Sequence, residues 1–99
     1  MKLDLFVEML KELSGQNYKV NYDPKTAKEL AIVDAKISEA KTQTDDFWRS
    51  DLASKVARYA KDKNDTVKQH AIEGLVEVMN GTNDWFWRSQ IMRSIDRLS

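Results

Sequence analysis

The tetrapeptide Phe-Trp-Arg-Ser stands at residues 47–50 of this chain and returns at residues 86–89, thirty-nine residues later. Upstream, residues 26–32 and 66–72 form a second related pair at an offset of forty. A period near forty is typical of tandem helical repeats, in which each unit is a helix, a short loop and a second helix. The alternative is that two amphipathic helices share the tetrapeptide by chance. After the tetrapeptide, similar side chains keep the same offset: Leu52, Val56 and Arg58 are matched by Ile91, Ile95 and Arg97.

The length of the chain bounds the number of domains. Its 99 residues can bury one modest core but not two independent ones. We therefore expect a single α-helical domain over residues 1–99. Within it we distinguish an N-terminal capping helix and loop (1–22), a first helical unit (23–62) and a second helical unit (63–99).

The composition argues against several functional classes. The charges of the 16 basic and 16 acidic residues cancel, so there is no large positive field of the kind that binds nucleic acid or an anionic membrane. The chain has no cysteine, which excludes a disulfide framework and a thiolate metal site. It lacks the apolar stretch of a secretion signal and any run of membrane-spanning length, so we expect a cytoplasmic protein with no membrane partner. Its small size and mixed charge also fit an accessory protein of a phage or mobile element.

The spacing of apolar residues predicts about five helices. In the first, over residues 3–14, apolar side chains recur at three- and four-residue steps, and Gly15 can terminate the helix. Residues 18–22 alternate as a short extended segment does. The second helix begins at Asp23-Pro24, because the carboxylate can accept from first-turn amides and proline gives up none that is needed. The apolar positions of the second helix are Ala27, Leu30, Ala31, Ala35 and Ile37.

The third and fifth helices each begin after a run of capping residues. Residues 42–46 offer oxygens and acidic charge before the third helix, and residues 82–84 do so before the fifth. The apolar stripes are Trp48, Leu52, Val56, Tyr59 and Ala60 in the third helix, and Trp87, Ile91, Ile95 and Leu98 in the fifth.

The fourth helix is expected to be the most buried. Asn64, Asp65 or Thr66 can cap it, and Thr66 with Gln69 three residues later would make a capping box. Apolar residues cover much of its circumference, which indicates a central element. Asn80-Gly81, a pair that tolerates positive φ, would end it.

The start of this fourth helix resembles the second helix of a HEAT repeat. The resemblance lies in Asn-Asp-Thr-Val-Lys at residues 64–68 and in Ala71, Gly74 and Leu75 after it. It covers about residues 23–99. HEAT and armadillo proteins stack antiparallel helix pairs into a solenoid whose surface binds other macromolecules, mostly proteins. The resemblance therefore implies a binding scaffold.

The chain also departs from the HEAT pattern. Lys68 stands where arginine is usual, and Asp34 occupies a position where the family prefers a small apolar residue. Two units are fewer than the three or so that an array generally needs, so the first helix would have to act as a cap. A non-repetitive five-helix bundle is the competing fold.

No motif indicates catalysis or metal binding. His70, the sole histidine, has Glu73 three residues later, but two ligands do not hold zinc or iron. We expect His70 to be solvated or to pack between helices. Because no Gly-rich phosphate loop or nucleophile elbow is found, we assign no catalytic, cofactor-binding or metal residue and expect no enzyme.

The aromatic residues of the repeated tetrapeptide divide into two groups. Trp48 and Trp87 fall on the apolar stripes, so we expect them in the core. Phe47 and Phe86 lie one residue off those stripes, which turns them by about a hundred degrees. We expect both phenylalanines to pack against the adjacent helical unit.

The remaining features favour binding to a partner. Tryptophan and arginine side chains are frequent interface anchors. Trp85 does not fall on the apolar stripe of the fifth helix, so it has no expected place in the core. We therefore expect a non-enzymatic protein-interaction module, an adaptor, inhibitor or assembly subunit, that binds a protein or itself. The predicted partner-binding residues are Trp85, Arg88, Arg49, Phe47 and Phe86. The alternative function is nucleic-acid binding, in which Arg49, Arg58, Arg88, Arg93 and Arg97 would contact phosphates. An enzyme with an unrecognised site comes third.

Overall fold

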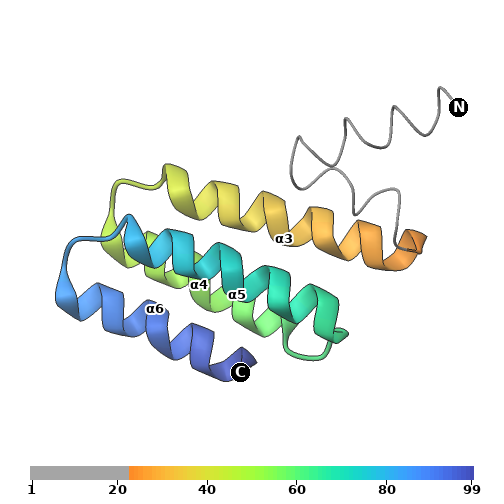
Figure 1. Cartoon of the computed structure of the whole chain (residues 1–99). Helices are drawn as coiled ribbons and strands as arrows, with labels where there is room; N and C mark the ends of the chain where they lie inside the picture. Colours follow the sequence, from red (N-terminus) through yellow and green to blue (C-terminus); the bar gives the residue numbers. More distant parts are fainter. Residues whose placement is uncertain (1–22) are drawn as a thin grey trace, which may run out of the picture.

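The structure, a computed structural model, describes residues 23–99, which are helical apart from short connections (Figure 1). The helices are α3 (Pro24–Thr42), α4 (Asp46–Ala60), α5 (Asp65–Asn80) and α6 (Trp85–Leu98). The all-α prediction is confirmed for these residues, which contain no strand. They hold four helices where about five were expected for the whole chain. The helix predicted over residues 3–14 and the extended segment at 18–22 lie outside the described residues.

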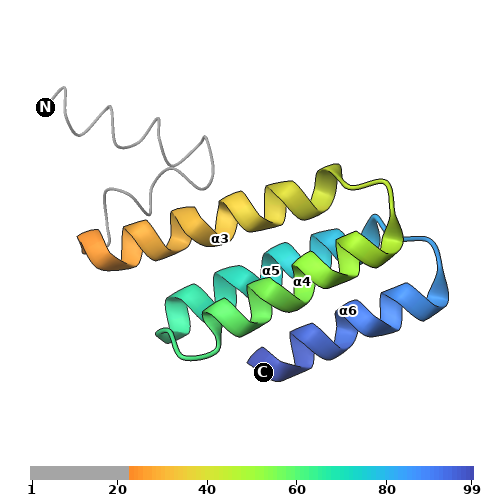
Figure 2. The ribbon, with the colours of Figure 1, turned by 180° about the vertical axis from the view of Figure 1, so that it is seen from behind.

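The four helices form two stacked antiparallel hairpins. α3 and α4 make one hairpin and α5 and α6 the other, with α3 packed on α5 and α4 packed on α6. In Figures 1 and 2, α4 and α5 lie in the middle, one behind the other, with α3 on one side and α6 on the opposite side. The centre is thus shared by α4 and α5, whereas the sequence indicated α5 alone. Membership of the HEAT family stays a prediction.

Each helix begins at a side chain that accepts hydrogen bonds from first-turn amides. Asp23 Oδ1 accepts from the amide of Thr26 at 2.9 Å, and Pro24 follows, as predicted. In α5 the cap is Asn64, and the predicted capping box is wrong because Gln69 Nε2 donates to Glu73 instead. These caps satisfy amides that would otherwise lack partners, which permits short connections. The four caps are Asp23, Asp45, Asn64 and Asp84.

The caps also fix the register of the repeat. Asp45 and Asp84 are thirty-nine residues apart, as the tetrapeptide predicted, but Asp23 and Asn64 are forty-one apart. The offset of forty inferred from sequence similarity is therefore wrong by one residue. At forty-one, buried positions of α3 coincide with buried positions of α5: Thr26, Leu30 and Ile37 correspond to Val67, Ala71 and Val78.

The predicted apolar stripe of α3 needs correction. Ala31 and Ala35 are exposed, whereas Val33 and Ala40 are fully buried. The buried residues follow steps of four, three, four and three, which is the helical period, while the prediction favoured small residues that lie off this line. The buried side chains of α3 are Thr26, Leu30, Val33, Ile37 and Ala40.

Gly74 allows α3 and α5 to approach each other closely. A Cβ built on Gly74 would lie 2.7 Å from Ile37 Cγ1 and 2.9 Å from Ile37 Cδ1, too close for ordinary contact.

Gly81 has a different role from the one predicted. It follows the last residue of α5, but its φ of −86° is not in the left-handed region, so the helix ends there without needing positive φ.

The two hairpins are tied together at both ends. Where α3 and α5 begin, Asn64 Nδ2 donates to Thr26 Oγ1 at 3.1 Å. At the opposite end, which holds the α3–α4 and α5–α6 loops in Figure 1, Arg49 donates to Gly81 O and to Thr82 Oγ1. Polar contacts therefore join the two hairpins at both ends of the seam between them.

Candidate interaction surface

Four aromatic rings in the first turns of α4 and α6 form one connected cluster. The ring centroids of Phe47 and Trp48 are 5.0 Å apart, and those of Phe86 and Trp87 are 4.8 Å apart. Phe47 also meets Trp87 across the two helices at 6.0 Å. All three contacts are edge-to-face, a geometry that aromatic pairs favour. We call Phe47, Trp48, Phe86 and Trp87 the aromatic cluster.

Three of these rings are more than half exposed. The exposed fractions are 51% for Phe47, 53% for Trp48 and 59% for Phe86. Trp87 is half-buried, since Phe47 covers it from the neighbouring helix. Contiguous exposed apolar side chains on a small domain typically mark an interaction surface. The cluster is therefore the main candidate for a functional site among residues 23–99.

The prediction that Trp48 belongs to the core is wrong. α4 faces the core with Ala53, Val56, Ala57 and Ala60, and Trp48 lies outside that buried face. Helical spacing alone pointed to Trp48 because the small alanines carried less apparent hydrophobic signal. Phe47 does contact the adjacent hairpin, as expected, whereas the ring contact of Phe86 is with Trp87 of its own helix.

Arg49 lies inside the molecule rather than on its outer surface. Its guanidinium donates through Nη1 to Gly81 O at 3.1 Å and to Thr82 Oγ1 at 3.2 Å, and through Nη2 to Gln43 O. It also forms an ion pair with Asp46 at 3.5 Å, and the side chain is only 15% exposed. Arg49 therefore holds both inter-helix loops beside the aromatic cluster.

Arg88 bonds the loop of its own hairpin, and its contact with Thr82 O is equivalent to that of Arg49 with Gln43 O. Its Nη1 donates to Met79 O at 3.3 Å and to Thr82 O at 3.1 Å. The guanidinium carbon also lies 5.5 Å from the centre of the Trp85 ring, within cation–π range. Trp85 is 80% exposed, as contact with a partner requires, but its ring is not part of the aromatic cluster. The partner-binding roles of Trp85 and Arg88 stay predictions.

Three exposed arginines share the outer surface of α4 and α6 with the phenylalanines. Arg58 follows Phe47 by eleven residues, and Arg97 follows Phe86 by eleven, which is three helical turns and about 16 Å. Arg97 Nη1 donates to Ser54 Oγ of α4 at 3.2 Å, so the two helices are adjacent there too. We call Arg58, Arg93 and Arg97 the arginine row.

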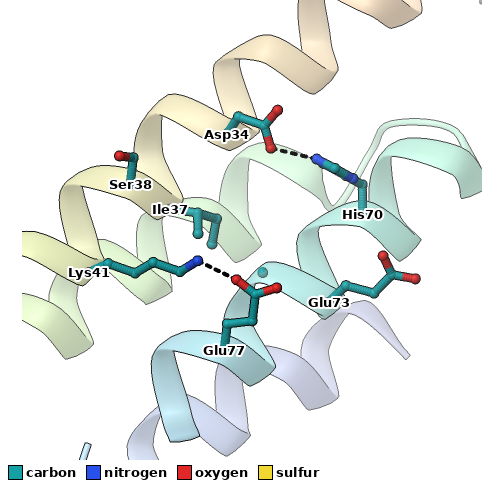
Figure 3. A pocket seen from close by; sticks show the side chains of 8 residues that line it. Asp34, Ile37, Ser38, Lys41, His70, Glu73 and Glu77 are labelled. Atoms are coloured by element: carbon teal, nitrogen blue, oxygen red, sulfur yellow. Dashed lines mark hydrogen bonds and ion pairs between the residues drawn. The ribbon is translucent and has the colours of Figure 1, made fainter. Parts of the chain in front are cut away.

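A second surface feature is an open groove of about 300 Å³ between α3 and α5 (Figure 3). At one end His70 Nε2 lies 2.6 Å from Asp34 Oδ1, and at the other Lys41 forms an ion pair with Glu77. Gly74 lies between these pairs. Since polar side chains pair across the groove at both of its ends, it acts as a polar seam between the hairpins.

The pairing of His70 with Asp34 corrects the sequence interpretation. His70 packs between helices, as expected, but its partner is Asp34 of α3 rather than Glu73 of its own helix. In the sequence, Asp34 stands out only as a departure from the HEAT pattern. An acidic residue at an otherwise apolar position was the signal that could have identified the pair.

The lowered pKa of Asp23 follows from its role as a helix cap. Hydrogen bonds from the amide and then the hydroxyl of Thr26 hold the pKa of Asp23 below its ordinary value.

Across residues 23–99, no group of three or more His, Asp or Glu side chains is placed to bind a metal ion. None of the four described helices has the length and apolar character needed to cross a membrane.

The chain was also compared with known proteins. No protein-family model matches it, and neither curated proteins nor solved structures gave a match. Functional inference therefore rests on the geometry of the surface itself.

Proposed function

We propose that this chain is a small non-enzymatic module that binds a protein partner through the aromatic cluster, as an adaptor, inhibitor or assembly subunit. The observation that carries the proposal is the connected row of rings, three of them more than half exposed. Aromatic side chains are enriched at protein interfaces because they bury a large rigid area at low entropic cost.

The loops beneath the cluster support this proposal. Arg49 and Arg88 donate to loop carbonyls on both hairpins, which fixes the first turns of α4 and α6. A surface held in place before binding loses less conformational entropy when it associates. Trp85 would lie at the margin of the interface, with Arg88 against its ring.

Site-specific photo-cross-linking tests the proposal. A photoreactive phenylalanine analogue replaces Phe47 in cells that express the chain, and a matched protein carries it at Met92, another exposed apolar position of α6. We expect a protein adduct from position 47 and little from position 92. An adduct between two copies of the chain would indicate self-association. Adducts from position 92 alone would place the interface elsewhere and contradict the proposal.

A binding measurement then separates contact from stability. Phe47→Ala with Phe86→Ala should abolish binding of the cross-linked partner, while circular dichroism and the thermal transition stay close to wild type because both rings are exposed. Met92→Ala is the matched control and should bind normally. Unfolding of the double variant would show that the rings are needed by the fold instead.

A further inference from the structure

We propose that the aromatic cluster and the arginine row together bind one acidic peptide segment of the partner. The apolar end of this segment lies on the rings and its carboxylates lie on the arginines. The inference rests on the proposed function and adds the chemistry of the partner. It follows from the layout of one continuous surface on α4 and α6.

The surface has an apolar end and a cationic end in both helices. In α4 Phe47 is followed three turns later by Arg58, and in α6 Phe86 is followed by Arg93 and Arg97. The contact of Phe47 with Trp87 joins the helices at the first end. The bond from Arg97 to Ser54 joins them at the other end. The two helices therefore present the same polarity side by side.

None of Arg58, Arg93 and Arg97 forms an ion pair with an acid among residues 23–99. Asp51 of α4 is already paired with Lys55, at 3.3 Å. Asp96 follows Arg93 by three residues on α6, so the two side chains are neighbours on the helix surface, but they form no ion pair. Exposed guanidinium groups bind carboxylates through two parallel hydrogen bonds, which makes carboxylate side chains the matching chemistry.

The surroundings of the rings favour a peptide over nucleic acid. The carboxylates of Asp45 and Asp84 cap the helices beside the cluster and would repel phosphates. The cluster rings meet edge-to-face and not in the parallel arrangement on which successive bases stack. The chain as a whole also has zero formal net charge.

The separation of the two ends sets the length of the segment. The roughly 16 Å from Phe47 to Arg58 and from Phe86 to Arg97 corresponds to about eleven residues of helix or five of extended chain, and Arg93 lies between, about 10 Å from Phe86. Apolar and acidic side chains should therefore be separated by one of these spacings. A partner that lacks this order should bind weakly even with the same composition.

The test is a selection from a displayed library of random peptides, about 15 residues long, against the full chain. Enriched peptides are then measured by fluorescence anisotropy, beside scrambled versions and a thymidine oligonucleotide. The variants are Arg58→Gln with Arg93→Gln, and Phe47→Ala with Phe86→Ala. Lys25→Gln with Lys28→Gln, exposed on α3, removes the same charge elsewhere and is the control.

We expect enriched peptides to place acidic residues at one of the two spacings from apolar ones. The arginine variant should weaken binding about tenfold, the phenylalanine variant should abolish it, and the lysine control should bind like wild type. Arg58 and Arg93 were chosen because the bond from Arg97 to Ser54 then stays intact.

Three results would overturn the inference. Peptides that depend on the phenylalanines but not on the arginines would leave the proposed function standing and remove the acidic partner. Tighter, arginine-dependent binding of the oligonucleotide would assign the surface to nucleic acid. Failure to enrich any peptide whose binding depends on this surface would show that it takes no peptide.

Discussion

The contact between Gly74 and Ile37 predicts an energetic coupling that can be measured. In Gly74→Ala, the new Cβ would lie 2.7 Å from Ile37 Cγ1, so a stiff β-branched side chain or the helices themselves must shift. Overpacking of this kind costs about 1–3 kcal/mol. Alanine is about 1 kcal/mol better than glycine within a helix. The net expectation is a loss of stability of up to about 2 kcal/mol.

The same substitution should change sign when Ile37 is truncated. Ile37→Ala removes the opposing carbon atoms and by itself costs about 2–5 kcal/mol, since the side chain is buried. In that background Gly74→Ala should stabilise by about 1 kcal/mol, its helix-propensity gain. Urea unfolding followed by circular dichroism on all four proteins gives the coupling energy, expected at about 1–3 kcal/mol. Equal stabilisation by Gly74→Ala in both backgrounds would refute a close approach of α3 and α5.

Three further predictions concern the loops and the first cap. Arg49→Ala should destabilise the fold by about 1–3 kcal/mol in urea titrations, because it removes the hydrogen bonds that join both inter-helix loops, and an unchanged midpoint would contradict this. Thr82→Ala should cost about 1–2 kcal/mol, since the buried hydroxyl bonds to Val78 O, whereas Thr82→Ser should lose much less. Because the pKa of Asp23 is lowered in the folded state, its carboxylate contributes to the free energy of unfolding above the unfolded-state pKa. This contribution is lost as pH falls through the folded-state pKa. Asp23→Asn should therefore flatten the acid limb of a stability–pH curve, and an unaltered limb would show that other groups cause it.

Much of the fold could be predicted from local chemistry. The helix starts could be predicted from the acceptor side chains that precede them. The grouping into two units could be predicted from the repeated tetrapeptide. These signals involve residues that are close in sequence, so they can be recognised without knowing how the helices pack. The register of the first helix in each unit was misassigned because similarity between residues 26–32 and 66–72 ignored the positions of Asp23 and Asn64.

The surface was harder to predict because it depends on contacts between helices. Trp48 was assigned to the core by its spacing, yet alanines fill the buried face of α4 and leave it outside. Arg49 was expected at an interface, but a loop thirty-two residues later supplies its acceptor. No local pattern reveals such a partner. The rings form a connected row only because α4 and α6 lie side by side.

The polar ties at both ends of the seam have a consequence for how the protein melts. Each hairpin alone has roughly half the described chain, too little to bury a stable core. Asn64 is bonded to Thr26 at one end and Arg49 to Thr82 at the other, so neither hairpin can unfold without exposing the buried face of the other hairpin to solvent. Unfolding should therefore be a single cooperative event, with equal calorimetric and van't Hoff enthalpies. A tandem architecture that could in principle come apart unit by unit would then behave as one thermodynamic body.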